Sequence, residues 1–427
     1  MSSMKYLKKM KSIQEFLLEF LNDESNSGAD LQFLTSKFQD LKFYESHYEL
    51  ESLLHLLVRI ANNHHCSSNF YGKIEAILTF YKDDIQKFFS NSQIFNIFVS
   101  NKRILLYLIE EKIITIDEYI VKKLTSDKYV KMKYPQYFSP EIRPFMNEKW
   151  FPKIEVKKEN NSRNNWNNLN NQDQNNLSNK WIEELKNELP EKFYEKRKNG
   201  QNDSYICELI EKDLVEEFIA YVNKINLSPR STIDFSNYET NSFLIKKFTQ
   251  FKNQESNKRF NPFFNNNQNN KKERISLIEY AAFFGSIQIF NYLRMNNVDL
   301  LPSLWMFAIH GNNAELIHLL EELNVKFGNN ECYMYIIESI KCHHNDLANY
   351  FINNYMQNAE DKEQSIFIQA LKYYNFNFIQ NKFIKKSFYH LCEYDYCPLV
   401  EILLKDENTN INEIVIFKKK NIYKIFN

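Results

Sequence analysis

The sequence is short of the residues that make tight turns. Only six of its 427 residues are glycine and nine are proline. The glycines lie too far apart to form a GxGxxG turn or a Walker loop, which excludes a phosphate site built from glycine backbone. An all-β sandwich or barrel needs many turns marked by Gly and Pro, so that class is disfavoured as well. The composition therefore predicts an all-α protein. The glycines are Gly28, Gly72, Gly200, Gly285, Gly311 and Gly328.

The sequence also lacks an excess of charge of either sign. Lysine and arginine together number 54, and so do aspartate and glutamate. A protein that binds nucleic acid non-specifically usually carries a basic excess, so no nucleic-acid partner is expected. Basic pairs such as Lys122 and Lys123 are interpreted as solvated faces of helices.

Long apolar runs and cysteine pairs are missing too. No stretch of 18 apolar residues occurs, so no membrane span is expected. The N-terminus has no continuous apolar segment of the kind found in secretory signals. The six cysteines form no CxxC pair, which favours a reducing compartment. These features together predict an intracellular, cytoplasmic location.

Asparagine is abundant, and its distribution divides the chain. Two low-complexity, Asn-rich runs contain little that a core could bury, so they are expected to be flexible. Helical periodicity precedes the first run, and prolines such as Pro135 and Pro140 are expected to end it. The predicted order is a helical N-terminal domain (1–156), an Asn-rich linker (157–179), a helical segment that can hold a degenerate repeat (180–251), an Asn-rich loop (252–274), repeats (275–412) and a basic-apolar C-terminal tail (413–427).

Residues 275–412 contain a self-similar pattern. The sequence Ala282-x-x-Gly285 recurs further along as Ala308-x-x-Gly311, and an apolar helical face follows each copy. Each copy is interpreted as a helix that ends at glycine with a positive φ, followed by an antiparallel second helix. One such pair cannot bury its own apolar face, so neighbouring pairs must stack. The frame continues, at uneven intervals, at Ser339, Ala370 and Leu391.

This pattern resembles the ankyrin repeat. Residues 276–285 match the first half of the motif Thr-Pro-Leu-His-x-Ala-Ala-x-x-Gly without its Pro and His, and residues 388–412 match the second half. The chain looks like a member of the large, degenerate ankyrin-repeat families of parasitic protists, in which a helical N-terminal region of unknown function precedes the repeats. The resemblance implies an α-solenoid of about five or six irregular repeats, whose concave surface binds proteins.

The later units depart from the family pattern. Their turn glycine is replaced by Cys342, Tyr373 and Tyr394, which must adopt a costly positive φ or end the helix differently. The array is therefore expected to be least regular from about residue 339 onward. A capping repeat is missing after Asn412, which leaves a truncated array open as an interpretation.

Few residues are candidates for chemistry. His64-His65-Cys66 and Cys342-His343-His344 contain the residue types that bind metals, but adjacent side chains on a helix point apart. No HExxH, GxSxG or kinase motif occurs. We therefore expect no catalysis, no metal, no cofactor and no small-molecule ligand.

The resulting hypothesis is a protein–protein interaction scaffold that binds an unknown protein partner through its first helices and turns. The alternatives left open are a structural protein at a membrane surface or in an Asn-rich condensate, and a decaying family copy without a selected function; an enzyme ranks last. The residues expected on the binding surface are Glu279, Phe283, Trp305, His310 and Asn313.

Overall fold

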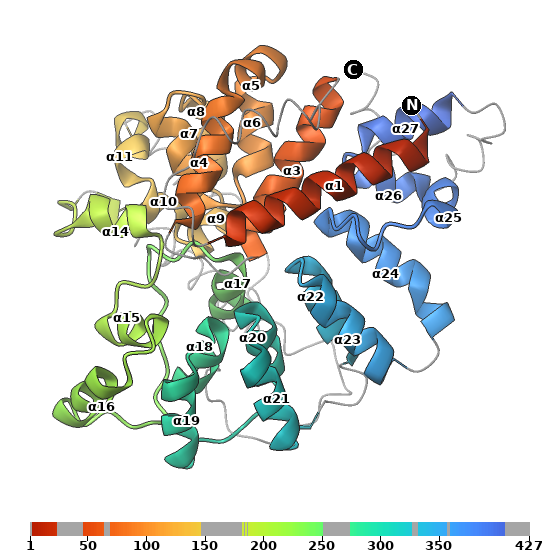
Figure 1. Ribbon diagram of the computed structural model, residues 1–427. Coiled ribbons are helices and arrows are strands. Elements are labelled where there is room, and N and C mark those ends of the chain that lie inside the picture. Colours follow the sequence, from red (N-terminus) through yellow and green to blue (C-terminus); the bar gives the residue numbers. More distant parts are fainter. Residues whose placement is uncertain are drawn as a thin grey trace, which may run out of the picture. The chain divides into compact units, whose positions relative to one another are not determined.

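In the residues that this computed structural model describes, all of the regular elements are helices (Figure 1). The structure describes residues 2–23, 46–63, 69–146, 182–250 except 183 and 186, 274–326, 332–356 and 359–405. No strand occurs among these residues, beyond one isolated bridge between Thr232 and Ser276. The predicted all-α class is therefore confirmed. None of the helices in this part of the chain is both long and apolar enough to cross a membrane.

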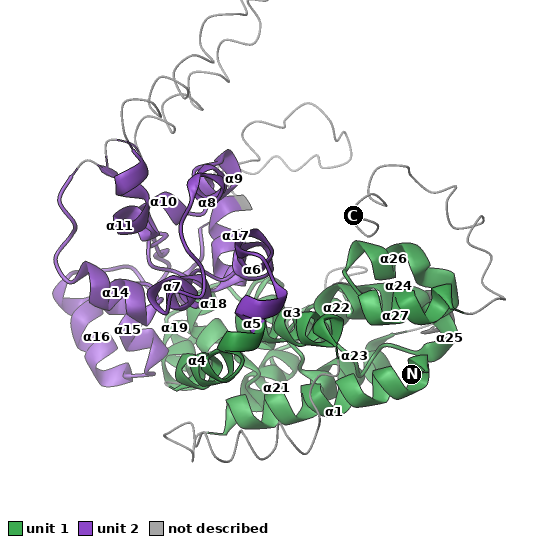
Figure 2. Ribbon diagram, turned by 90° about the horizontal axis from the view of Figure 1, so that it is seen from above, with its two compact units in different colours: residues 1–84, 278–427 green, residues 85–277 purple. Residues whose placement is uncertain are grey.

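The chain divides into two compact units (Figure 2). Unit 1 contains residues 1–84 and 278–427, and unit 2 contains residues 85–277. The segment 1–84 thus groups with the C-terminal helices, and not with residues 85–156 as in the expected N-terminal domain. Chain order does not reveal such a grouping, because apolar helix faces can pack across any separation in sequence. The predicted linker 157–179, nearly all of the loop 252–274 and the tail 413–427 lie outside the described residues.

Unit 2 consists of short helices. Pro135 and Pro140 lie in the first turns of two of them, where a missing N–H costs nothing. The expectation that these prolines end the helical region is therefore wrong. The helices are α6 (Asn91–Phe98), α7 (Lys102–Glu110), α8 (Glu118–Leu124), α9 (Asp127–Lys131), α10 (Tyr134–Tyr137), α11 (Ser139–Ile142), the 3-10 turn η1 (Arg143–Phe145), α14 (Phe193–Asn199), α15 (Tyr205–Glu211), α16 (Val215–Lys224) and α17 (Ser242–Gln250).

Unit 1 combines N-terminal helices with a series of helix pairs. Its first part holds α1 (Ser3–Asn22), α3 (His47–Asn63) and α4 (Phe70–Phe80), while α5 (Lys82–Phe88) and α18 (Leu277–Phe284) cross the limits of the unit. The first helices of successive pairs, α20, α22, α24 and α26, contact one another in a row (Figure 1). The remaining helices are α19 (Ile287–Met295), α20 (Leu304–Gly311), α21 (Ala314–Glu322), α22 (Cys332–Lys341), α23 (Asn345–Tyr355), α24 (Ala359–Tyr373), α25 (Asn381–Ile384), the 3-10 turn η3 (Lys385–Ser387), α26 (Phe388–Glu393) and α27 (Cys397–Leu404).

One kind of turn ends the first helix of each pair. A residue with positive φ follows the helix, and in most pairs the next N–H returns to the carbonyl five residues earlier, as His344 N does to Ser339 O at 3.0 Å. This is the Schellman arrangement, which pairs carbonyls that a helix end leaves unsatisfied. The left-handed residues are Asp213, Gly285, Asn312, His343, Tyr374 and Asp395.

These turns lie one residue away from several expected positions. In the later pairs the positive φ belongs to His343, Tyr374 and Asp395, each directly after the residue predicted to replace glycine. Gly285 does have a φ of +68°, as expected, but its equivalent in the next pair is Asn312. The predicted turn at Gly311 is therefore wrong, and the first two turns lie one residue further apart than the sequence pattern implies.

Gly311 allows α18 and α20 to pack closely and does not form the turn. A Cβ atom at this position would lie 2.7 Å from the carbonyl oxygen of Ala282 and 3.1 Å from that of Phe283. The end of α20 thus approaches the backbone at the end of α18 more closely than any side chain allows. Glycine is required here by a neighbouring helix and not by its own φ.

The row of pairs loses its regularity later than expected. The α22–α23 pair is well formed, although irregularity was expected from about residue 339. After α24, residues 374–380 form a turn and no second helix, and the short α25 and η3 follow. The irregular part therefore begins at the turn after α24.

The left-handed turn at Asp395 allows a test of backbone strain. Asp395 is exposed and has a φ of +60°. Glycine adopts this conformation without the Cβ penalty, whereas alanine does not. We expect the Asp395→Gly variant to be about 1 kcal/mol more stable than Asp395→Ala in urea unfolding, because the two variants differ mainly in that penalty. Equal stabilities would show that this turn relaxes away from positive φ.

Candidate functional site

Three of the five residues expected on a binding surface are buried. Trp305 has no exposed surface, and its Nε1 donates to the carbonyl oxygen of Val325 at 2.9 Å. Phe283 and His310 are also buried, and their rings stack with centroids 5.5 Å apart. A partner would not reach these three side chains in the described structure.

The other two expected residues are partly exposed but structurally engaged. Glu279 accepts a hydrogen bond from Ser303 Oγ at 2.7 Å. Asn313 caps α21, since its Oδ1 accepts from Leu316 N at 3.1 Å, and its Nδ2 donates to the carbonyl oxygen of Gly285. The predicted residues therefore join α18, α20 and α21 and do not form one continuous surface.

His310 belongs to a buried polar cluster between α20 and α22. Its Nε2 lies 2.6 Å from Glu338 Oε1, and Lys341 Nζ lies 2.6 Å from the same oxygen. Cys342 completes the cluster, with Sγ 3.5 Å from Nδ1 of His310. A carboxylate only accepts hydrogen bonds, so both nitrogens donate to Glu338.

Charge stabilises the ionised carboxylate of Glu338 in this cluster. Burial alone would raise its pKa, but the charge of Lys341 and the hydrogen bond from His310 hold that pKa well below its ordinary value. For Lys341, burial would lower the pKa, but the charge of Glu338 raises it. The cluster is thus a buried ion pair with His310 as a second donor.

The geometry of the cluster does not suit a metal ion. His310, Glu338 and Cys342 each offer a ligand atom, and these atoms lie within 4.8 Å of one another. However, Cys342 Sγ is 3.5 Å from one ring nitrogen of His310 and 3.6 Å from the other. A zinc ion bound to one nitrogen in the ring plane would hold its thiolate at about 3.5 Å from that nitrogen and about 5 Å from the other. The three groups are arranged to bond to one another.

Cys342 is also unsuited to nucleophilic chemistry. Burial and then the charge of Glu338 raise the pKa of its thiol well above the ordinary value. A nucleophilic cysteine needs the opposite shift and access for a substrate. Both Cys342 and His310 are almost completely covered. The cluster therefore acts as a polar connection between two helices.

The two runs of metal-ligand residue types have different outcomes. His64-His65-Cys66 lies outside the described residues. In the second run, His343 adopts a positive φ and its Nε2 lies 3.4 Å from the carbonyl oxygen of Tyr374, while His344 occupies the N-cap position of α23. Burial lowers the pKa of His343 to about 4, so this side chain is neutral at pH 7.

The sequence did not point to Glu338 or Lys341 as partners of His310. Glu338 lies 28 residues after His310, whereas the turns that end their two helices, at Asn312 and His343, lie further apart. Because the turns are unevenly spaced, no fixed offset pairs residues of neighbouring helices. The one available signal was the i, i+3 spacing of Glu338 and Lys341 on a helical face.

Unit 2 contains a second buried pair of ionisable residues, Lys102 and Glu239, that the sequence did not indicate. Lys102 is fully covered, and its Nζ donates to the carbonyl oxygen of Glu239 at 3.0 Å. The rings of Tyr134, Tyr137 and Phe235 lie 5.3 to 5.9 Å from this nitrogen. Burial lowers the pKa of Lys102 to about 7, although the charge of Glu239 raises it, and burial raises the pKa of Glu239 to about 7.

This pair predicts an unusual dependence of stability on pH. The pKa of Lys102 is about 7 in the folded chain and 10.5 ordinarily, so between these values the unfolded chain binds more protons. Wild-type stability should therefore rise from pH 7 to pH 10 relative to Lys102→Met, by at most about 1.4 kcal/mol per pH unit. Urea unfolding of both proteins at pH 6, 8 and 9.5 measures this difference. A difference that does not change with pH would contradict the buried, neutral lysine.

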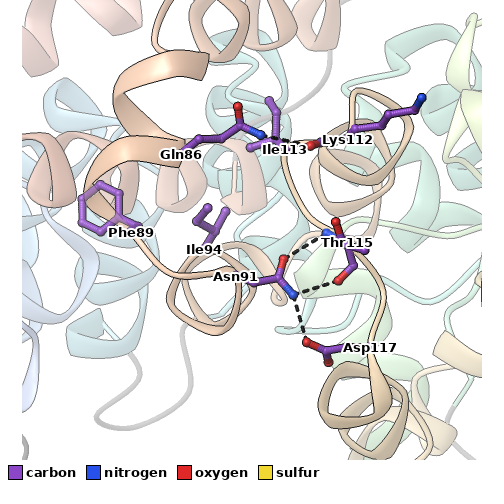
Figure 3. Close-up of a pocket in the computed structure, with 8 residues that line it drawn as sticks. All are labelled: Gln86, Phe89, Asn91, Ile94, Lys112, Ile113, Thr115 and Asp117. Atoms are coloured by element: carbon purple, nitrogen blue, oxygen red, sulfur yellow. Dashed lines mark hydrogen bonds between the residues drawn. The ribbon is translucent and has the colours of Figure 1, made fainter.

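A shallow pocket of about 390 Å³ lies in unit 2 between α6 and residues 112–117 (Figure 3). Asn91 spans it, since its Nδ2 donates to Thr115 O at 2.8 Å and to Asp117 Oδ2 at 3.0 Å, while its Oδ1 accepts from Thr115 N. Gln86 similarly donates to the carbonyl oxygen of Lys112. The polar groups of the pocket thus fasten this segment of chain, which makes the pocket a poor candidate for a ligand site.

Comparison with known proteins identifies no relative. No family model, no curated protein and no solved structure matches this chain. Its function must therefore be inferred from its own residues.

Proposed function

We propose that this chain is a protein–protein interaction scaffold whose helix pairs in unit 1 are ankyrin-like repeats stacked as a solenoid. The observation that supports this best is the row of contacts between successive first helices, α20 with α22, α22 with α24 and α24 with α26. A left-handed turn also ends each first helix from α18 to α26, as it ends the second helices α19 and α21. Stacked repeats present an extended surface formed by corresponding positions of neighbouring units, and such surfaces bind proteins.

The exposed apolar residues at the starts of the first helices provide a contact surface for this function. Leu301, just before α20, is 55% exposed, and Met334, in the first turn of α22, is 51% exposed. The hydroxyl of Tyr335 lies 3.4 Å from the carbonyl oxygen of Pro302, which brings these two helix starts together. Large exposed side chains on neighbouring units can be covered by a single partner, and methionine adapts easily to different partners.

A capture experiment with the full chain tests this proposal. We expect Leu301→Ser combined with Met334→Ser to weaken the binding of captured partners at least tenfold, since burial of each apolar side chain contributes about 1.5–3 kcal/mol. Met295→Ser is the matched control, because Met295 is 73% exposed but lies on the second helix α19. Partner binding that survives the double substitution unchanged, or that is lost equally in the control, would contradict the proposed surface.

A further inference from the structure

The last helix pair of unit 1 is covered by the chain's own N-terminal helices. α1 contacts α25 and α27, and α3 contacts α27 as well (Figure 1). The opposite face of α1 is polar apart from Met4, with Lys5, Lys8, Lys11 and Glu15 exposed. An apolar inner face with a polar outer face is what a stacked array needs at its end.

A buried amide connects α1 to the irregular turn after α24. Gln14 has no exposed surface; its Nε2 donates to Asn375 Oδ1 at 3.1 Å, and its Oε1 accepts from Phe376 N at 2.6 Å. Asn375 in turn donates to the carbonyl oxygen of Ile340 at 2.8 Å and to Asn345 Oδ1 at 2.9 Å. Gln14 therefore satisfies backbone and side-chain groups at the place where α24 is not followed by a second helix.

Aromatic packing covers the same end of the row. Tyr6 of α1 meets Phe376 edge to face, with centroids 6.4 Å apart, and its hydroxyl donates to Ser52 of α3 at 3.0 Å. His55 of α3 stacks on Tyr374 at 5.3 Å. Without α1 and α3, these rings and the apolar side of α27 would be exposed to water.

A lysine of α4 pairs with carbonyl groups at the C-terminal end of α1. Lys73 of α4 is buried, and its Nζ donates to the carbonyl oxygen of Phe20 at 2.7 Å and to that of Asp23. A cation at this position pairs carbonyls that the helix leaves unsatisfied and opposes the negative end of the helix dipole. α1 is thus held along its face and at its end.

We propose that α1 is the cap of the helix-pair array, and that it prevents this end from binding a second copy of the chain. This inference rests on the proposed stacking of the pairs. An uncapped end exposes a face made to pack on another helical unit, and the same face of a second copy can pack on it in a symmetric pair. α1 occupies that face first, since it belongs to the same chain and has a high effective concentration.

Cys397 offers a probe for the cap that does not depend on any partner. It begins α27, and burial followed by the charge of Glu51 raises the pKa of its thiol to about 12. The helix α27 that it begins contacts α1. Cys397 is already partly exposed, and release of α1 would expose it further and accelerate its reaction with a maleimide. Cys332 in α22 is the internal control, because it is partly exposed, as Cys397 is.

The experiment compares Gln14→Ala with Glu15→Ala in the full chain. Glu15 is the exposed neighbour of Gln14 on the same helix, so its substitution leaves the inner face intact. We expect Gln14→Ala to accelerate labelling of Cys397 at least tenfold, with Cys332 unchanged, and to give a mass by light scattering that rises with concentration. Glu15→Ala should behave as the wild type. Unchanged labelling in Gln14→Ala, or faster labelling in a protein that stays monomeric, would overturn the proposal.

A milder variant keeps the test decisive if Gln14→Ala unfolds. Tyr6→Phe removes only the hydroxyl that donates to Ser52. A selective increase in the labelling of Cys397, with self-association, supports the cap. If both Gln14→Ala and Tyr6→Phe accelerate the labelling of Cys397 and Cys332 equally, the proposal is overturned. In that case α1 cannot be released without unfolding the rest of the core. None of these measurements depends on the capture of a partner. The cap proposal can therefore be contradicted while the proposed binding function is upheld, and the binding function can be contradicted while the cap is upheld.

Discussion

Replacing Gly311 by alanine is expected to destabilise unit 1 by about 3 kcal/mol, the upper range for an overpacked site. The new Cβ would lie 2.7 Å from the carbonyl oxygen of Ala282 and 3.2 Å from the amide nitrogen of Gly285. These are backbone atoms at the end of α18, so no side-chain rotation relieves the contact. The helices α18 and α20 must separate, which loses packing such as the stack of Phe283 on His310. Urea unfolding followed by circular dichroism measures the change.

Gly72→Ala is the matched control for this substitution. Gly72 also lies in a helix of unit 1, and its nearest atom to a new Cβ is Asn69 Oδ1, which belongs to a side chain that can rotate. Alanine is favoured over glycine in a helix by up to about 1 kcal/mol, so this variant should be as stable as the wild type or more so. A similar loss in both variants would show that close backbone approach is not the reason for glycine at position 311.

Replacing Glu338 by alanine is expected to cost about 3–5 kcal/mol, the usual range for breaking a buried ion pair. The variant leaves the largely covered Lys341 without its anionic partner and removes the acceptor of His310. Because folding lowers the pKa of Glu338, the carboxylate stabilises the fold above its ordinary pKa of 4.5, and this contribution is lost as the pH falls. The variant should therefore differ most from the wild type at neutral pH and least in acid.

The double variant Glu338→Leu with Lys341→Met separates the cost of an unpaired charge from the value of the pair. Apolar replacement of both partners of a buried pair is often neutral. We expect the double variant to be more stable than Glu338→Ala by about 2 kcal/mol or more in the same urea experiment. If the double variant is as unstable as the single one, the loss comes from packing and not from the charge of Lys341.

Local features of the fold were within reach of the sequence, and long-range ones were not. The spacing of Ala308, Ser339, Ala370 and Leu391 along the chain equals the spacing of the left-handed turns that follow these residues. The predicted interval between the first two turns, from Gly285 to Gly311, is one residue too short. Gly311 was assigned to the turn, whereas the close approach of α18 is what requires glycine there. Glycine can be required at a position either by a positive φ or by the close approach of another backbone. Only the tertiary structure shows which of the two applies.

The candidate site shows the same division. His310 was singled out as an exposed residue, but Glu338, Lys341 and Cys342 surround it in the structure. Trp305 was expected on a binding surface and is fully covered. Burial depends on how neighbouring helices are spaced and rotated. Because the intervals between the turns are uneven, the spacing and rotation of neighbouring helices cannot be read from the sequence.

The sequence by itself determined the helical class and the spacing of the left-handed turns that end α20, α22, α24 and α26, because composition and helical periodicity can be read directly along the chain. Only the tertiary structure decided that Gln14 pairs with Asn375, 361 residues away, and that the N-terminal helices cover the last helix pair. Contacts of this kind depend on shape and polar groups that meet only after folding, so no local pattern encodes them.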